Sequence, residues 1–197
     1  MRRSHSLRDP AAWRTPSNRG YTLLELVVVI SIISVLAAVA LPGMGPSEEQ
    51  KLELAASRVA DAIRHARTEA LRTGEGHGLT ISQSTQKVTV EQYDLTTAPV
   101  SAIATLIHPI DKQPYDININ TTPSTSGVTI SNSQDVFNYS GLGRRRSLIF
   151  NANGTPIWVV GSGPTTYLLS DGTVELSYGR QQRVVRVATI TGRVTVE

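Results

Sequence analysis

The longest hydrophobic segment of the chain lies near its N-terminus, where residues 26–41 read LVVVISIISVLAAVAL without a charged side chain. With residues 21–25 in front, the segment spans about 21 residues, or roughly 30 Å of helix, close to the hydrocarbon thickness of a bilayer. A buried core helix is the alternative, but an unbroken apolar run of this length is apolar on every face. We therefore expect a transmembrane helix over residues 21–42.

A second helical pattern follows a break at Pro42, Gly43, Gly45 and Pro46. Ser47 and Gln50 have the spacing of a capping box, which marks the start of a helix. Apolar residues then recur at helical spacing, at Leu52, Ala55, Ala56, Val59, Ala62, Ile63, Ala66 and Ala70, while Arg58, Arg64 and Arg67 fall largely outside this stripe. The pattern predicts an amphipathic helix from about Ser47 to Arg72, ending near Gly74 and packed against a sheet.

The remainder of the chain alternates in the manner of β-strands. The expected strands are 79–82, 87–93, 103–107, 117–119, 128–130, 148–150, 157–160, 165–169, 174–178, 184–190 and 193–196. Turns are expected at 84–85, Asp171-Gly172 and Thr191-Gly192, and the Thr-, Ser-, Asn- and Pro-rich stretch 96–133 reads as loops with short strands. The predicted fold class is α+β, with the long N-terminal helix packed on an antiparallel sheet.

Residues 1–20 form a polar leader that contains five arginines and one aspartate. A secretory signal peptide carries its apolar stretch before the cleavage site, whereas here the apolar stretch follows Gly20. The arginines favour a cytoplasmic leader and place the C-terminal part across the membrane. The whole chain has a net charge of +3 and the leader has a net charge of +4, so the rest of the chain has a net charge of −1. Charge therefore gives no general case for nucleic-acid binding. The chain has no cysteine, and therefore no disulfide or thiolate metal site.

Glu25 is the unusual residue of the apolar segment. A carboxylate costs about 2.5–3.5 kcal/mol deep in a membrane and less near its surface. One interpretation is that Glu25 lies among the lipid headgroups. The other pairs it with a positive group on a neighbouring helix of the same kind, and a free amine at Tyr21, created by cleavage after Gly20, is such a group.

The segment RGYTLLELVVVISIISVLAAVALP resembles the N-terminal signature of type IV pilins and type II secretion pseudopilins. The resemblance implies that prepilin peptidase cuts after Gly20 and methylates Tyr21, that Glu25 guides assembly with other pilins, and that Pro42 interrupts the helix. Tyr21 departs from the usual phenylalanine but keeps an aromatic ring. The implied organisation is a leader at 1–20, a transmembrane and assembly helix at 21–42, its amphipathic continuation at 43–73, and a periplasmic β-rich domain at 74–197.

Two short C-terminal motifs sharpen this resemblance. Residues 150–156, FNANGTP, and residues 191–194, TGRV, are similar to the GspH/FimT group of minor pseudopilins and minor pilins. The resemblance implies a structural subunit of a type II secretion pseudopilus, anchored in the bacterial inner membrane and lying at or near the filament tip. The alternative is a FimT-like minor pilin of a type IV pilus that takes part in assembly or in DNA binding and uptake. Secreted substrates and DNA are candidate partners, and a membrane-anchored domain without a filament is a third reading.

Other candidate sites are weaker. A glycine-arginine stretch contains Arg144, Arg145 and Arg146, and Arg186 and Arg193 flank the predicted terminal turn, so these arginines are candidate DNA or anion contacts. DNA-binding members of the group carry a second arginine two positions after the first, where this chain has Thr195. Glu75 and His77 alone make a poor metal site. Nothing in the sequence predicts a cofactor, and no catalytic constellation supports an enzyme.

Overall fold

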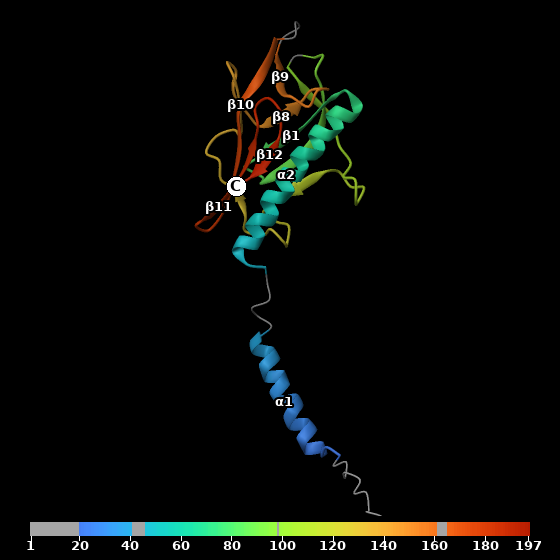
Figure 1. The fold of residues 1–197 in the computed structure, drawn as a ribbon, viewed down its shortest axis with the longest axis vertical. Helices are drawn as coiled ribbons and strands as arrows, with labels where there is room; N and C mark the ends of the chain where they lie inside the picture. Colours follow the sequence, from blue (N-terminus) through green and yellow to red (C-terminus); the bar gives the residue numbers. More distant parts are fainter. Residues whose placement is uncertain (1–19, 41–45, 98, 161–164) are drawn as a thin grey trace, which may run out of the picture. The chain divides into compact units, whose positions relative to one another are not determined.

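The computed structural model describes residues 20–40, 46–97, 99–160 and 165–197. These residues form two compact units, divided between Gly45 and Pro46. The predicted helix break at Pro42 and the predicted leader up to residue 19 lie outside the described residues. The first unit contributes one helix, and the second holds a helix and a sheet (Figure 1).

The helix of the first unit, α1, runs over Leu23–Ala40. Its apolar side chains are exposed around the helix, from 45% at Val29 to 81% at Leu23. Among the described residues of both units, no helix is long and apolar enough to cross a membrane.

The helix of the second unit, α2, runs over Glu48–Thr73 and confirms the sequence prediction closely. Ser47 is its N-cap: the Ser47 hydroxyl accepts from the Gln50 N–H at 3.2 Å, and the Gln50 side chain accepts from the Ser47 N–H at 3.0 Å. Gly74 ends the helix in the left-handed conformation that favours glycine. The predicted apolar stripe is fully buried, together with Ala60, which the prediction omitted.

The described strands form one antiparallel sheet with the main order β12-β11-β10-β9-β8-β1-β2-β3. Their bounds are β1 Gly76–Ser82, β2 Lys87–Asp94, β3 Ser101–Thr105, β4 Asp116–Asn118, β5 Thr129–Ile130, β6 Phe137–Tyr139, β7 Gly143–Arg145, β8 Ser147–Phe150, β9 Pro156–Val160, β10 Thr165–Tyr178, β11 Gln181–Val187 and β12 Val194–Val196. Of the short strands, β4 pairs with β2, β5 and β6 pair with β10, and β7 pairs with β6. A helix laid against antiparallel sheet confirms the predicted α+β fold.

The main core lies between α2 and the sheet. Alanines make up most of the α2 stripe, so the helix backbone can approach the strands closely, and Leu79, Val90, Phe150, Leu176 and Val185 meet it from the sheet. Every buried hydrophobic side chain of the described residues belongs to the second unit. Residues 46–197 therefore contain a complete hydrophobic core of their own, consistent with an independently folding domain.

One predicted turn is wrong. Asp171-Gly172 was expected to form a hairpin turn, but both residues lie inside β10, where they pair with Asn138 and Phe137 of β6. The register shifts between Leu169 and Asp171, so the strand carries an irregularity here. A Cβ at Gly172 would lie 2.9 Å from a Leu169 methyl carbon and 3.1 Å from Val187 Cβ. The glycine therefore serves close packing inside a strand, which the sequence alone does not separate from a turn.

Candidate functional site

The predicted cleavage junction lies immediately before α1. Gly20 and Tyr21 are both exposed and non-helical, and a side chain added at Gly20 would meet no atom within 4 Å. A protease needs an accessible, non-helical peptide bond in its substrate. Exposed, non-helical Gly20 and Tyr21 meet this need, and a larger residue at position 20 does not clash with the described residues.

Glu25 sits in the first turn of α1, beside the predicted new N-terminus. The Thr22 hydroxyl accepts from the Glu25 N–H at 3.2 Å, which places Thr22 at the N-cap and leaves the Glu25 carboxylate exposed. The N-terminal end of a helix carries a partial positive charge that favours an acidic side chain there. A positive charge just before this turn, such as a free amine at Tyr21, would strengthen this effect.

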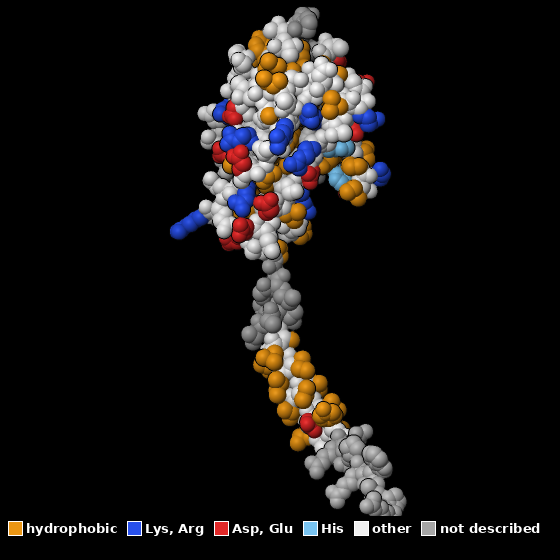
Figure 2. All heavy atoms as spheres, viewed as in Figure 1, with side chains coloured by type: hydrophobic (Ala, Val, Ile, Leu, Met, Phe, Trp, Pro, Cys, Tyr) orange, Lys and Arg blue, Asp and Glu red, His pale blue; other side chains and the backbone are white. Residues whose placement is uncertain are grey.

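The rest of α1 presents an apolar surface with no free polar group. The hydroxyls of Ser31 and Ser34 donate to the Val27 and Ile30 carbonyls, each at 2.7 Å. Figure 2 shows the helix covered by hydrophobic side chains, with an acidic group near one end. A surface of this kind calls for an apolar partner, either lipid or other helices.

The two C-terminal motifs are brought together in the second unit. Gly154, at the G-T-P turn, has a left-handed φ of 69°, and Gly192, in the T-G-R turn, has a φ of 64°. A Cβ at Gly192 would lie 2.7 Å from a Phe150 ring carbon and 2.8 Å from the Gly154 carbonyl oxygen. Arg67 of α2 donates to the same carbonyl at 3.2 Å. The motifs thus form one structural contact that joins α2, β8 and the β11–β12 turn.

The predicted arginine cluster at 144–146 is largely tied to the protein. Arg144 lies 3.6 Å from the Asp171 carboxylate and donates to the Asp135 carbonyl at 3.2 Å. Arg146 lies 3.4 Å from the Asp135 carboxylate, and the Arg145 guanidinium stands 5.9 Å from the centre of the Trp158 ring. These surface contacts give each of the three arginines a partner within the protein.

The arginines nearer the C-terminus are placed differently. Arg186 and Arg193 line one hollow of about 460 Å³, together with the hydroxyl-bearing residues Ser170, Thr189 and Thr195 and the carboxylate of Asp171. Arg186 lies 3.5 Å from the Glu197 carboxylate, whereas Arg193 is exposed and makes no ion pair among the described residues. The structure therefore brings the two predicted residues together, while both Glu197 and Asp171 reduce the positive charge there.

Sequence reasoning gave no role to Arg183. Its guanidinium lies 3.3 Å from a Glu49 carboxylate oxygen and 3.1 Å from one of Glu53, which links β11 to the first turns of α2. Helical spacing predicts that Glu49 and Glu53 share a face. The sequence around them does not predict that their partner is Arg183, which lies about 130 residues away. Among the described residues, no three histidine, aspartate or glutamate side chains gather to hold a metal ion.

The junction, the acidic first turn and the apolar surface of α1 resemble the N-terminus of type IV pilin-like proteins. The chain matches the family "Prokaryotic N-terminal methylation motif" over residues 15–41, which confirms that predicted resemblance. It is also 40% identical over 65 residues to the pilin-like protein PilA1 of Thermus thermophilus, a match that covers 33% of this chain and 41% of the relative. The chain thus aligns with less than half the length of that relative. The first match is to an N-terminal motif and the second is to a pilin-like protein, and neither description is that of an enzyme.

Solved structures that are similar to this chain include a minor pseudopilin and a minor pilin. The minor pseudopilin EpsH from the type 2 secretion system of Vibrio cholerae is 16% identical, with a TM-score of 0.45 over 75% of this chain and 96% of that one. The type IV minor pilin FimU of Pseudomonas aeruginosa is 15% identical, with a TM-score of 0.43 over 76% of this chain and 90% of that one. A likeness at this level carries no argument about function.

Proposed function

We propose that this chain is a minor pseudopilin, a structural subunit of a type II secretion pseudopilus at or near the filament tip. Prepilin peptidase cleaves it after Gly20 and methylates Tyr21. Residues 21–42 anchor it in the bacterial inner membrane, and the domain of residues 46–197 faces the periplasm. The observation that carries the proposal is the methylation motif over residues 15–41, with Glu25 in the first turn of an otherwise uncharged helix.

The assembly step follows from the charge at the start of α1. A carboxylate in an apolar environment is costly unless it is paired, and so is an isolated ammonium group. When two such helices lie side by side, Glu25 of the incoming subunit neutralises the N-terminal amine of its neighbour. The remaining apolar surface of α1 then packs against lipid and helices, neither of which requires any polar partner from it.

Cleavage is tested by Gly20→Glu. Because a Cβ at position 20 meets no atom of the described residues within 4 Å, the variant should fold normally but remain an uncut, unmethylated precursor. Intact-mass spectrometry of membrane fractions measures both modifications. A mature-sized product from this variant contradicts the proposed cleavage site.

Assembly is tested by Glu25→Ala. This variant should be cut and methylated but absent from sheared filaments, because the neighbour's amine then lacks its counter-charge. Ser31→Ala is the matched control, since the Ser31 hydroxyl bonds only to its own helix backbone. Normal recovery of Glu25→Ala in filaments would remove the proposed role of the carboxylate.

The machine that it serves is tested by deletion of the gene. Exoproteins trapped in the periplasm, with surface pili intact, are the expected result for a type II secretion subunit. Normal secretion with loss of pili or DNA uptake instead supports the alternative, a FimT-like minor pilin of a type IV pilus.

The second candidate function is DNA binding, favoured by the hollow that Arg186 and Arg193 share. Phosphate contacts of this kind give binding that falls steeply with salt. Fluorescence anisotropy of labelled DNA with residues 46–197 should then show salt-sensitive binding that Arg193→Ala and Arg186→Ala weaken and Arg145→Ala does not. Absence of binding at low salt dismisses this function.

A further inference from the structure

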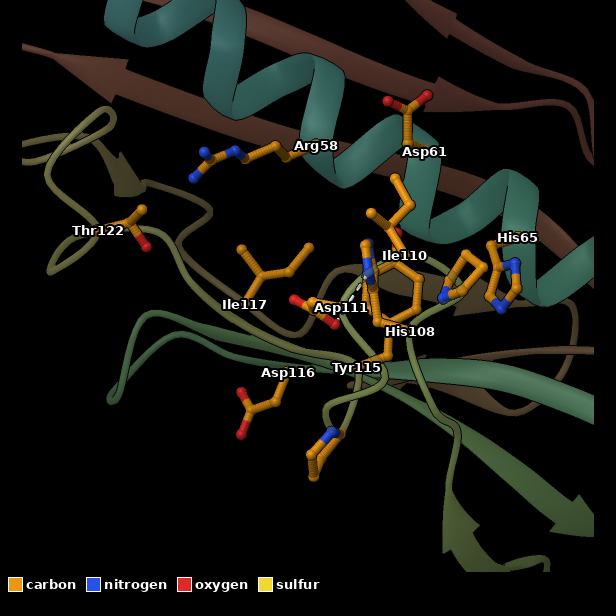
Figure 3. A pocket seen from close by; sticks show the side chains of 12 residues that line it. Arg58, Asp61, His65, His108, Ile110, Asp111, Tyr115, Asp116, Ile117 and Thr122 are labelled. Atoms are coloured by element: carbon orange, nitrogen blue, oxygen red, sulfur yellow. Dashed lines mark ion pairs between the residues drawn. The ribbon is translucent and has the colours of Figure 1, made fainter.

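A cavity of about 580 Å³ lies between α2 and the segment 106–117 that follows β3. Arg58, Asp61 and His65 line it from the helix, and His108, Asp111 and Tyr115 are among the residues that line it from the segment (Figure 3). It is separate from the α1 junction and from the hollow of the C-terminal arginines. Neither the fold nor the proposed assembly step requires it.

The floor of this cavity is preformed. Tyr115 is only 6% exposed, and its ring lies 4.5 Å from that of His108 and 5.3 Å from that of His65, measured between ring centres. The Tyr115 N–H donates to the Leu106 carbonyl at 2.7 Å, and the Tyr115 carbonyl accepts from the Val90 N–H at 2.9 Å. The hydrogen bond from Val90 holds the segment on β2, and the Tyr115 ring contacts His65 of α2.

Acidic side chains outnumber basic ones in the lining of the cavity. Asp61, Asp111 and Asp116 line it, against the single lining cation Arg58. Arg58 donates to the Ser124 hydroxyl at 2.9 Å and extends away from Asp111 toward Thr122 (Figure 3). Asp61 and Asp116 already face cations, since Asp61 lies 2.8 Å from Arg64 and Asp116 pairs with Lys87.

Of these three aspartates, Asp111 is the one that pairs with no lysine or arginine among the described residues. Its carboxylate lies 3.2 Å from the Nδ1 atom of His108, which is an ion pair only when the imidazole is protonated. That nitrogen is buried and has no hydrogen-bond partner among the described residues, so the geometry of the pair is not that of a hydrogen bond. The Asp111 side chain itself is 61% exposed. A carboxylate that is open to solvent and lacks a permanent counter-ion is available to an incoming cation.

We propose that this cavity receives an arginine or lysine side chain presented by a neighbouring subunit of the filament. Ile110 and Ile117 offer apolar surface to the aliphatic stem, and Asp111 meets the cationic head. The exposed carboxylate of Asp111 disfavours an anionic ligand at this end of the cavity. The inference rests on the proposed function in one respect: the proposed function identifies the partner as a filament subunit.

The contact suits a partner that is already tethered. One exposed ion pair gives little affinity by itself. Assembly of the N-terminal helices would hold neighbouring domains at high effective concentration, where a weak contact becomes sufficient to select and orient a neighbour. Exposed Ile110, at 85%, stands at the mouth of the cavity and adds apolar area to such a contact.

The binding test uses the full chain in detergent micelles with isotope-labelled histidine. The probe is a short peptide with one arginine between serines, and the same peptide with neutral citrulline is its control. The arginine peptide should shift the imidazole signals of His65 and His108 in a saturable way and leave that of His77, on β1, unchanged. Asp111→Asn should weaken the affinity about threefold, Asp61→Asn should weaken it less, and the exposed Glu175→Gln should have no effect.

The partner test places a photoreactive amino acid at position 110 in cells. The expected product links this chain to a cleaved and methylated pilin-like subunit through a peptide that contains a lysine or arginine, and Asp111→Asn should reduce its yield. Equal shifts with the citrulline peptide, unchanged affinity in Asp111→Asn, or a crosslink to any other protein overturns the proposal. None of these outcomes bears on cleavage at Gly20 or on Glu25, which are measured separately by mass and filament recovery.

Discussion

Replacement of Gly192 by alanine tests whether the two C-terminal motifs are structural. The left-handed φ of 64° costs an alanine about 1 kcal/mol relative to glycine. The added Cβ would also lie 2.7 Å from a Phe150 ring carbon, 2.8 Å from the Gly154 carbonyl oxygen and 3.1 Å from Arg67 Cδ. Overpacking of this kind costs about 1–3 kcal/mol, because the ring and the turn must both move.

The expected total is a loss of about 3 kcal/mol in the free energy of unfolding, since the cost of conformation and the cost of overpacking add. For a domain of this size, that loss lowers the melting temperature by about 6–12 °C. Thermal and urea unfolding of residues 46–197, followed by circular dichroism, measures both quantities. Arg67 should also lose its hydrogen bond to Gly154, which proton exchange at its Nε would report.

Gly143→Ala is the matched control. Gly143 has a left-handed φ of 85°, but a Cβ there would meet no atom within 4 Å. It carries the same conformational cost and the same change in the unfolded chain, without the overlap. We expect it to lower the melting temperature by about 2–4 °C. If both variants lose the same stability, the contact between the motifs is not tight and the reasoning fails.

Two further changes test local features of the second unit. Ser47→Ala removes the capping box of α2 and should lower the free energy of unfolding by about 1 kcal/mol. Ser47→Asp should keep most of the stability of the cap, because aspartate is also a good N-cap residue. Equal stability of the two variants would contradict the role of the cap. His65 has a pKa lowered from its ordinary value of 6.5, mainly by burial and against the opposing effect of Glu69. The unfolded chain therefore binds the proton more readily, and stability should fall as the pH drops from about 7.5 through 6.5 to about 5.5. Urea unfolding across this range should show a smaller fall in His65→Gln, and an identical fall in both proteins would refute the assignment.

The sequence prediction was most accurate for features that are determined by residues close together in the sequence. The ends of α2 were predicted to within a residue, because Ser47, Gln50 and Gly74 act on the backbone beside them. The fold class followed from periodicity, which depends on which residues are buried and not on which strand pairs with which. The Asp171-Gly172 error has the same origin: the residues suit a turn, and only the approach of β6 and Val187 shows why a glycine stands inside a strand.

The site predictions divide in the same way. The junction at Gly20, Tyr21 and Glu25 could be identified from sequence because its chemistry lies within a few neighbouring residues. The arginines at 144–146 could not be interpreted, because Asp135, Asp171 and Trp158 reach them only through the sheet. The cavity beneath Ile110 was also beyond prediction: it depends on Tyr115 of a loop-rich segment standing between two histidines that are distant in sequence.

The surface of α1 limits what that helix can recognise. Its serine hydroxyls are bound by its own backbone, its other exposed side chains are apolar, and Glu25 is its one charged group. Apolar helices pack against many similar helices, and one carboxylate can pair with any free N-terminus, so these features favour assembly but distinguish poorly between partners. Selection of a particular neighbour therefore needs groups with fixed geometry and charge. Within the described residues these lie on the second unit, where the acidic cavity around Asp111 and the hollow around Arg193 offer opposite charges at different positions.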